Sequence, residues 1–252
     1  MKLIDVHCHL ADPCFDRDCD EVVKRALDSG VVAIVTSSQS LEEALKTAEL
    51  CKRHRGVLYH SAGLDPCLLN EEAVLQVAEF IKRNRDQLVA IGEVGLDFHK
   101  VVERDRKEKQ HKIFSFWISL ARELDLPLVV HSRSAGKYAV EQLLAEGVER
   151  VLMHAFDGKV GYAIKAASRG FFFSIPTSVV YSQQKQKLVK HLPLESLMVE
   201  TDSPVLGPKP GRNEPANLHY AVEKIAEIKG ISIEKVAEIT FRNATAFFEI
   251  KT

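Results

Sequence analysis

The chain has 252 residues, of which 46% are hydrophobic and 27% are charged, a composition typical of a globular protein with a well-buried core. Its formal net charge is −1, so no overall positive field draws it to nucleic acid or to an anionic membrane, and any polyanion must be held locally. No apolar run approaches the roughly 20 residues that a membrane helix needs. We therefore expect one domain over residues 1–252 that does not interact with a membrane.

The 5 cysteines are odd in number, lie in the first third of the chain and show no paired Cys-x-x-Cys spacing. This pattern is typical of free thiols in a reducing compartment, and the chain starts without the pattern of a signal peptide. The sequence therefore predicts a cytoplasmic protein. Cys8 lies between two histidines, but alternation along a strand turns it to the opposite face, which favours core packing over metal ligation.

Short apolar segments alternate with amphipathic segments along the whole chain. In chain order we expect a strand in the first half of residues 2–10, a helix at 18–29, a strand at 31–35, a helix at 40–54, a strand at 57–62, a helix at 70–85, a strand at 88–93, a helix at 104–124, a strand at 126–131, a helix at 134–146, a strand at 150–154, a helix at 159–168, a strand at 171–174, a helix at 183–191, a strand at 197–200, and helices at 216–229 and 232–248. The buried stripes of two of these helices are expected to include Leu45 and Phe116.

About eight short strands, each followed by a helix, are typical of a (β/α)₈ TIM barrel, an α/β fold whose length also matches this chain. The strands are continuously apolar, as expected when both faces of a parallel sheet are covered. A doubly wound open sheet is the alternative, because alternation of strands and helices does not by itself prove that the sheet closes.

The first strand ends in a His-x-His pair. Side chains on a strand alternate between two faces, so Asp5, His7 and His9 are expected to point the same way. Neutral imidazole is a common ligand for divalent metals, and two rings leaving one strand end can hold a single ion. An isolated His-x-His pair also occurs without any metal, so the rest of the chain has to decide between the two interpretations.

Further metal-competent side chains stand at the ends of other predicted strands, and in a barrel all strand ends of this kind meet on the C-terminal face, where active sites are built. With the first pair they form a set of four histidines and two carboxylates: His7, His9, Glu93, His131, His154 and Asp202. Each one alone is more often a solvated rim residue. Together they predict a metal centre.

Six motifs in order along the chain resemble those of TatD-family metal-dependent deoxyribonucleases, within the broader amidohydrolase superfamily. They are Asp5-Val6-His7-Cys8-His9-Leu10, Gly92-Glu93-Val94-Gly95-Leu96-Asp97, His131-Ser132-Arg133, His154-Ala155-Phe156-Asp157-Gly158, Glu200-Thr201-Asp202-Ser203-Pro204 and Arg212-Asn213-Glu214-Pro215-Ala216-Asn217. The segments Ser174-Ile175-Pro176 and Gln184-Lys185-Gln186-Lys187-Leu188 are most similar to the TatD domain-containing 3 branch. The resemblance covers essentially the whole chain.

This resemblance implies two adjacent divalent metal ions, with Mg, Mn or Zn as candidates. One site is expected to use His7, His9 and Asp202, and the other His131 and His154, with Glu93 bridging the two. Two such ions can polarise a phosphodiester and activate water at neutral pH. Asp202 and Glu93 are then the expected catalytic carboxylates, with Asp202 as the base that deprotonates the attacking water. Glu200 is expected either to support this site or to make a buried structural contact.

Loops at the same end of the barrel carry candidate substrate contacts. Arg133 and Arg212 are expected to bind a phosphate, because a guanidinium can donate two hydrogen bonds to it. Solvated surface charge is the alternative for both. Phe98, Phe156 and Tyr181 can stack on bases, although packing within the loops is expected for at least two of them.

The chain departs from the family pattern after its third predicted strand. The family usually has Gly-x-His-Pro there, whereas this chain has Gly63-Leu64-Asp65-Pro66. A carboxylate at this position is expected to repel a phosphate or to recruit another cation. Asp65 is therefore a third candidate substrate contact, and it leaves the identity of the phosphodiester substrate open.

We expect a metal-dependent hydrolase of ester bonds, namely a phosphodiesterase or nuclease of the 3′–5′ exonuclease type that acts as a monomer on DNA or RNA ends. The first alternative is an amidohydrolase-type deacylase or esterase, such as a D-aminoacyl-tRNA deacylase, which uses the same ions. The second is a metal-binding protein without catalysis, which the complete ligand set disfavours.

Overall fold

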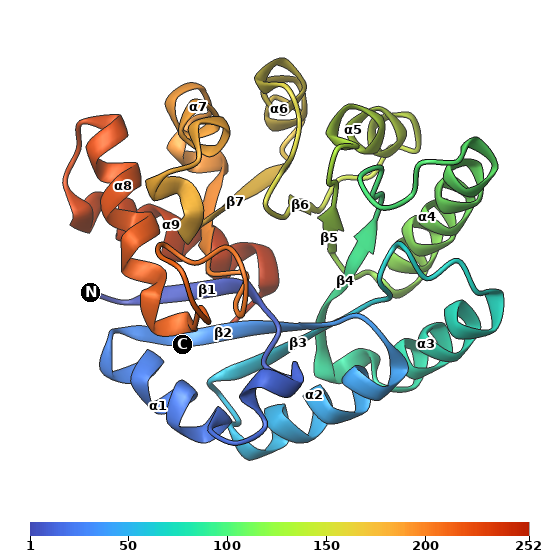
Figure 1. The fold of residues 1–252 in the computed structure, drawn as a ribbon, viewed down its shortest axis with the longest axis horizontal. Helices are drawn as coiled ribbons and strands as arrows, with labels where there is room; N and C mark the ends of the chain where they lie inside the picture. Colours follow the sequence, from blue (N-terminus) through green and yellow to red (C-terminus); the bar gives the residue numbers. More distant parts are fainter. Residues whose placement is uncertain (252) are drawn as a thin grey trace.

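A computed structural model describes residues 1–251 and shows eight parallel strands surrounded by helices (Figure 1). The strands are β1 (Leu3–Cys8), β2 (Val31–Ser38), β3 (Leu58–Ala62), β4 (Leu88–Gly95), β5 (Leu128–His131), β6 (Val151–Met153), β7 (Phe172–Pro176) and β8 (Leu197–Glu200). The helices are α1 (Cys19–Asp28), α2 (Leu41–Arg53), α3 (Glu71–Arg83), α4 (Arg104–Leu124), α5 (Gly136–Ala145), α6 (Val160–Ala167), α7 (Gln183–His191), α8 (His219–Lys229) and α9 (Ile233–Phe248). No helix of this part of the chain has both the length and the apolar content needed to cross a membrane.

The strands pair in sequence order from β1 to β8, which confirms the predicted (β/α)₈ barrel and rules out the doubly wound order. The first and last strands also meet. Just beyond β8, the backbone N–H of Asp202 donates to the carbonyl oxygen of His7 at 2.9 Å, and the N–H of His9 donates to that of Ser203 at 2.8 Å. These two hydrogen bonds join the segments that carry the predicted ligands His7, His9 and Asp202.

The core has two layers. Inward-facing side chains such as Ile4, Ala33 and Val129 form an inner apolar cluster, and a larger cluster fills the space between the strands and the surrounding helices. Phe247 of α9 belongs to the inner cluster, and Asn243 of the same helix donates to the carbonyl oxygens of Leu194 and Leu197, at the start of β8. These contacts place α9 over the N-terminal end of the barrel.

Several helices begin where a short polar side chain accepts a hydrogen bond from the first turn. The Ser40 hydroxyl accepts from the N–H of Glu43 at 3.2 Å, and the Asn70 side chain accepts from the N–H of Ala73 at 3.0 Å. Such caps satisfy backbone donors that have no partner inside the helix, and each stabilises it by about 1 kcal/mol. They start α2 and α3 one residue after the cap, within one residue of the predicted starts.

Two helix faces differ from the prediction. Leu45 is 55% exposed and Phe116 is 36% exposed. In α2 the buried positions are Ala44, Thr47 and Leu50, so the face toward the barrel is rotated by about one residue from the predicted stripe. The apolar pattern alone cannot fix this rotation, because leucine also occurs at exposed helix positions.

Two strands beside the site are longer than predicted, whereas β5 and β6 are shorter by two residues each. β2 continues to Ser38 and β4 to Gly95, whereas the sequence predicted ends at residues 35 and 93. The additional residues lie at the C-terminal ends of the strands, and all of them except Val94 are polar or glycine. The predicted free thiols are confirmed for all 5 cysteines, and Cys8 is buried in the core as expected.

Candidate metal centre

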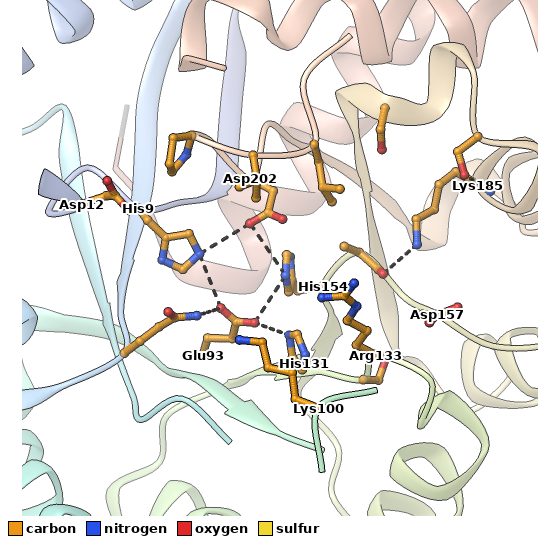
Figure 2. Close-up of a pocket in the computed structure, with 18 of the residues that line it drawn as sticks. His9, Asp12, Glu93, Lys100, His131, Arg133, His154, Asp157, Lys185 and Asp202 are labelled. Carbon is orange, nitrogen blue, oxygen red and sulfur yellow. Dashed lines mark hydrogen bonds and ion pairs between the residues drawn. The ribbon is translucent and has the colours of Figure 1, made fainter. Parts of the chain in front are cut away.

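The six predicted ligands lie together at the C-terminal end of the barrel, beside a cavity of about 580 Å³ (Figure 2). They stand at the ends of five strands, or just beyond them: β1, β4, β5, β6 and β8. Five of the six line this cavity, namely His9, Glu93, His131, His154 and Asp202. The sixth, His7, is fully buried beneath them.

Glu93 lies at the centre of the cluster. Its Oε2 atom is 3.4 Å from Nε2 of His7 and 3.4 Å from Nε2 of His9. Its Oε1 atom accepts a hydrogen bond from Nδ1 of His131 at 2.5 Å and lies 3.5 Å from Nε2 of His154. Each carboxylate oxygen therefore faces its own pair of imidazoles, which is the arrangement expected of a ligand that bridges two ions.

Asp202 approaches the same imidazoles from the other side. Its Oδ1 atom lies 3.6 Å from Nε2 of His7, 3.5 Å from Nε2 of His9 and 3.9 Å from Nε2 of His154. The donor atoms form three overlapping groups, and within each group all atoms lie within 4.8 Å of one another. The groups are His7 with His154 and Asp202, His7 with His9 and Glu93, and Glu93 with His131 and His154. This mixture of nitrogen and oxygen donors suits a divalent transition metal.

Three of the imidazoles are oriented by a partner on their second nitrogen. Nδ1 of His7 lies 3.1 Å from the Ser37 hydroxyl. Nδ1 of His154 lies 2.9 Å from Oε2 of Glu200, and Nε2 of His131 lies 3.0 Å from Oδ2 of Asp97. Such partners fix the tautomer and direct the other nitrogen to a metal. The residues present therefore fit a metal centre. Glu200 makes both of the contacts expected for it, because its second oxygen, Oε1, accepts a hydrogen bond from the N–H of Ala155 at 2.9 Å.

Burial and charge act against each other on the ionisable groups of this cluster. Burial alone would raise the pKa of Glu93, but the charges of His131 and His154 hold it well below its usual range. Burial would lower the pKa of His131, but the charge of Glu93 and the hydrogen bond with Asp97 raise it to about 9. For His154, the charges of Glu200, Asp202 and Glu93 overcome burial and raise the pKa to about 10. Without a metal ion, protons on these two histidines balance the carboxylates.

Asp5 does not join the cluster, contrary to the alternation predicted along the first strand. Its carboxylate accepts hydrogen bonds from the hydroxyl and the N–H of Thr201, at 2.5 Å and 2.9 Å. The pairing of β1 with β2 shifts register between Asp5 and Cys8, and Val6 belongs to the inner apolar cluster. Because this irregularity interrupts the alternation, Val6 and His7 can both contribute to the barrel interior.

Two glycines allow the backbone to pack closely around these ligands. A Cβ atom at Gly63 would lie 2.4 Å from the carbonyl oxygen of Glu93. A Cβ atom at Gly95 would lie 2.2 Å from the carbonyl oxygen of His131, and the φ of Gly95 is +139°. A side chain at Gly63 would push the segment after β3 away from Glu93, and one at Gly95 would push apart β4 and β5, which carry Glu93 and His131.

The structure separates the two arginines that were predicted to bind phosphate. Arg133 lines the cavity, and Figure 2 shows it on the same side as His131 and His154. Arg212 is not among the lining residues. Its guanidinium donates to both carboxylate oxygens of Asp18 at 2.6 Å and 2.7 Å, and it lies over the Phe15 ring. An arginine held by a carboxylate has few donors left for a phosphate, so the structure does not bring Arg212 to the predicted site.

Asp65 is also outside the cavity lining. Its Oδ1 atom accepts a hydrogen bond from the N–H of Cys67 at 2.8 Å, which stabilises the turn after β3. The carboxylate is thus used by its own loop, and the structure does not place it opposite an incoming phosphate. Its short side chain satisfies a turn donor, which explains an aspartate here without a role in repulsion.

The three candidate stacking aromatics have different environments. Phe156 is fully buried and contacts Phe173 edge to face, and Phe98 packs against Tyr138. Tyr181 is 60% exposed and lines the cavity. Packing therefore accounts for two of the three, as expected, and Tyr181 alone of these is free to meet a base.

The cavity lining includes residues that the sequence analysis did not single out, among them Gln39, Lys100 and Lys185. The Gln39 side-chain amide donates to Oε2 of Glu93 at 2.8 Å, and Lys100 and Lys185 line the cavity. Lys100 follows the Glu93 motif closely, so its position in that loop was the one available signal. Gln39 lies just after a strand without any charge to mark it, and Lys185 reads as one of several lysines on a polar helix.

Comparisons with known proteins agree with this geometry. Residues 4–249 match the model of the family described as TatD related DNase. The chain is 45% identical to Deoxyribonuclease TATDN3 of Homo sapiens, covering 98% of this chain and 95% of the relative, and 35% identical to an uncharacterized metal-dependent hydrolase of Methanocaldococcus jannaschii, covering 99% and 98%. The crystal structure of YJJV, a TatD homologue from Escherichia coli, superposes with a TM-score of 0.90 at 25% identity, covering 99% and 98% of the two chains. The chain therefore belongs to the family of TatD-related DNases.

Proposed function

We propose that this protein is a metal-dependent phosphodiesterase that removes nucleotides from the ends of DNA or RNA, with 3′–5′ exonuclease polarity. The observation that carries the proposal is the position of Glu93 between two pairs of imidazoles. Family membership and the identity to a named deoxyribonuclease support a phosphodiester as the bond that is hydrolysed. Neither the family match nor this relative supports a deacylase, and both disfavour a metal-binding protein without catalysis.

The ligands divide as follows in this proposal. His7, His9 and Asp202 would hold one divalent ion, His131 and His154 a second, and Glu93 would bridge them, with Mg, Mn or Zn as the candidate metals. When bound, such ions supply Lewis-acid polarisation of the phosphodiester and lower the pKa of water. All these ligands come from one chain, so the site needs no second copy, which supports a monomer.

The chain's own residues supply base, orientation and substrate contacts. Asp202 is the proposed base, because its carboxylate borders the cavity and its pKa is lowered, with burial outweighed by the charge of His154 and the hydrogen bond with His9. Arg133 and Lys100 are placed to bind the cleaved phosphate, and Tyr181 to stack on a base. The free cysteines support a reducing compartment such as the cytoplasm.

The experiment that tests this function is a hydrolysis panel on purified protein. Single-stranded DNA, RNA, bis(p-nitrophenyl) phosphate and an aminoacyl-tRNA are each incubated with chelator and then with Mg²⁺, Mn²⁺ or Zn²⁺ restored. We expect metal-dependent release of nucleotides from the 3′ end of DNA or RNA and no deacylation. Release of amino acid without phosphodiester cleavage would refute the nuclease and support the deacylase.

We expect up to two ions per chain in gently purified protein, measured by elemental analysis and located by anomalous diffraction. The prediction follows from the two donor sets that share Glu93. His131→Ala and His154→Ala should each reduce the metal content toward one ion per chain. Metal-replete protein with no ion in contact with His131 and His154 would contradict the two-metal arrangement.

Metal binding is expected to release protons at neutral pH. His131 and His154 have pKa values raised to about 9 and about 10 in the metal-free protein, so both are protonated at pH 7, whereas a metal ligand must be neutral. Metal affinity should therefore increase as the pH rises from 7 toward 9. Titration calorimetry in buffers of different ionisation enthalpy measures the protons released, and a binding enthalpy independent of the buffer would contradict the prediction.

A further inference from the structure

Lys185 is a buried lysine in the cavity wall to which the proposed reaction assigns no role. It belongs to α7 and is 9% exposed. Figure 2 shows its side chain extending from this helix toward the side of the cavity where Asp157 and Arg133 also lie. A lysine that is almost completely buried is uncommon unless its charge has a partner.

The contacts of its ammonium leave one donor free. Nζ of Lys185 donates to the carbonyl oxygens of Ala155 and Phe156, each at 2.7 Å. Within residues 1–251, no carboxylate oxygen lies close enough to Nζ of Lys185, at 4.0 Å or less, to form an ion pair with it. An ammonium carries three hydrogens, so two neutral acceptors satisfy only part of it. The buried positive charge lacks a counter-charge in direct contact, and such a charge is unfavourable in a protein interior.

The surroundings suggest which ligand would complete this environment. Burial lowers the pKa of Lys185, while the more distant carboxylates of Asp157, Glu200 and Asp202 favour its charged form. The lysine contacts the loop that follows His154 and does not touch the donors around Glu93. An anion that binds Lys185 without reaching the donors around Glu93 would be a second group, distinct from the phosphate at the metal centre. In a nucleic acid the nearest such group is the neighbouring phosphate.

Resting on the proposed nuclease function, we propose that Lys185 binds the phosphate next to the one that is cleaved. Its third hydrogen donates to a non-bridging oxygen of that phosphate, while the Ala155 and Phe156 carbonyls hold the ammonium in place. The enzyme then distinguishes oligonucleotides, which carry a second phosphate, from substrates with only one. Lys185 is a specificity residue in this proposal and takes no part in bond cleavage.

The competing explanation is that Lys185 only fastens the loop after His154. Lys185→Gln and Lys185→Met separate the two, because glutamine keeps side-chain donors for the carbonyls but loses the charge, and methionine loses both. Lys187→Gln on the exposed face of the same helix is the matched control. Each variant is assayed on a thymidine dinucleotide with one phosphate and on the trinucleotide with two.

For the trinucleotide, we expect the KM of Lys185→Gln to rise by roughly 10- to 100-fold with little change in kcat, because a charged hydrogen bond is lost. The dinucleotide should be cleaved by this variant as by the parent, and Lys187→Gln should match the parent on both substrates. Equal losses on the two substrates together with a lower metal content would overturn the proposal and leave Lys185 as a support for the loop.

A binding measurement separates this proposal from the nuclease function itself. Oligonucleotide affinity is measured against salt by fluorescence anisotropy in the Asp202→Asn background. Adding Lys185→Gln should reduce the salt slope by about 0.7, the value for one phosphate contact on a single strand. An unchanged slope overturns the phosphate contact. A reduced slope, combined with a parent protein that hydrolyses no phosphodiester in the substrate panel, supports the contact while rejecting the nuclease function.

Discussion

Replacing Asp202 by Asn is expected to lower kcat/KM on a phosphodiester by roughly 10²- to 10⁴-fold while leaving the fold intact. The loss arises because an amide cannot accept the proton of the attacking water and is a weaker metal ligand. The fold survives because Asp202 has a φ of +55°, a left-handed conformation that Asn adopts more readily than most residues. Its backbone N–H continues to donate to the carbonyl oxygen of His7.

The measurement is steady-state kinetics at saturating metal, with metal content and thermal unfolding recorded on the same preparation. Asp12→Asn is the matched control, since Asp12 lines the same cavity and accepts a hydrogen bond from the N–H of Cys14, which an amide oxygen can also accept. We expect its activity to equal that of the parent. Activity of Asp202→Asn within a few-fold of the parent would move the base to another residue.

The fold was predictable from the sequence because the barrel repeats one signal eight times. A continuously apolar strand such as Val31–Val35 followed by a capped amphipathic helix leaves few alternatives to a parallel sheet covered on both faces. Closure of the sheet into a barrel could not be predicted from this local pattern. It depends on the approach of His9 to Ser203, which are far apart in the sequence and paired only once the barrel has formed.

The grouping of the candidate metal ligands was predictable because each lies at the end of an apolar strand or just beyond it, and parallel strands bring all such residues to one end of a barrel. The contacts made by residues around these ligands could not be predicted. Arg212 pairs with Asp18, 194 positions away, and no local pattern marks that pairing. Gln39 reaches Glu93 through a side-chain amide whose direction is set by the fold of its loop. Periodicity fixes which end of the barrel a residue reaches, but only the packed loops fix its partners.

Glu93→Gln is expected to lower the metal content and to reduce activity at limiting metal by more than roughly 10²-fold. Loss of a residue that only hydrogen-bonds to a metal ligand costs up to roughly 10²-fold, and loss of a ligand should cost more. Glu93 offers one oxygen to His7 and His9 and the other to His131 and His154. Glutamine has nearly the same shape but only one acceptor oxygen and no charge. Its NH₂ group would replace one of the two bridging oxygens, so a shared ligand becomes at best a ligand to one ion.

A second consequence of Glu93→Gln can be measured without any substrate. In the metal-free variant, the pKa of His131 should fall from about 9 toward its ordinary value, because the Glu93 charge that raises it is gone while burial still lowers it. Fewer protons would then be released on metal binding at pH 8. NMR titration of the imidazole signals measures the change in the pKa of His131 directly. Glu43→Gln is the matched control, because Glu43 lines the same cavity but accepts its hydrogen bond from the Gln39 N–H. A Glu93→Gln protein that retains two ions and the activity of the parent would show that this carboxylate does not bridge the metals.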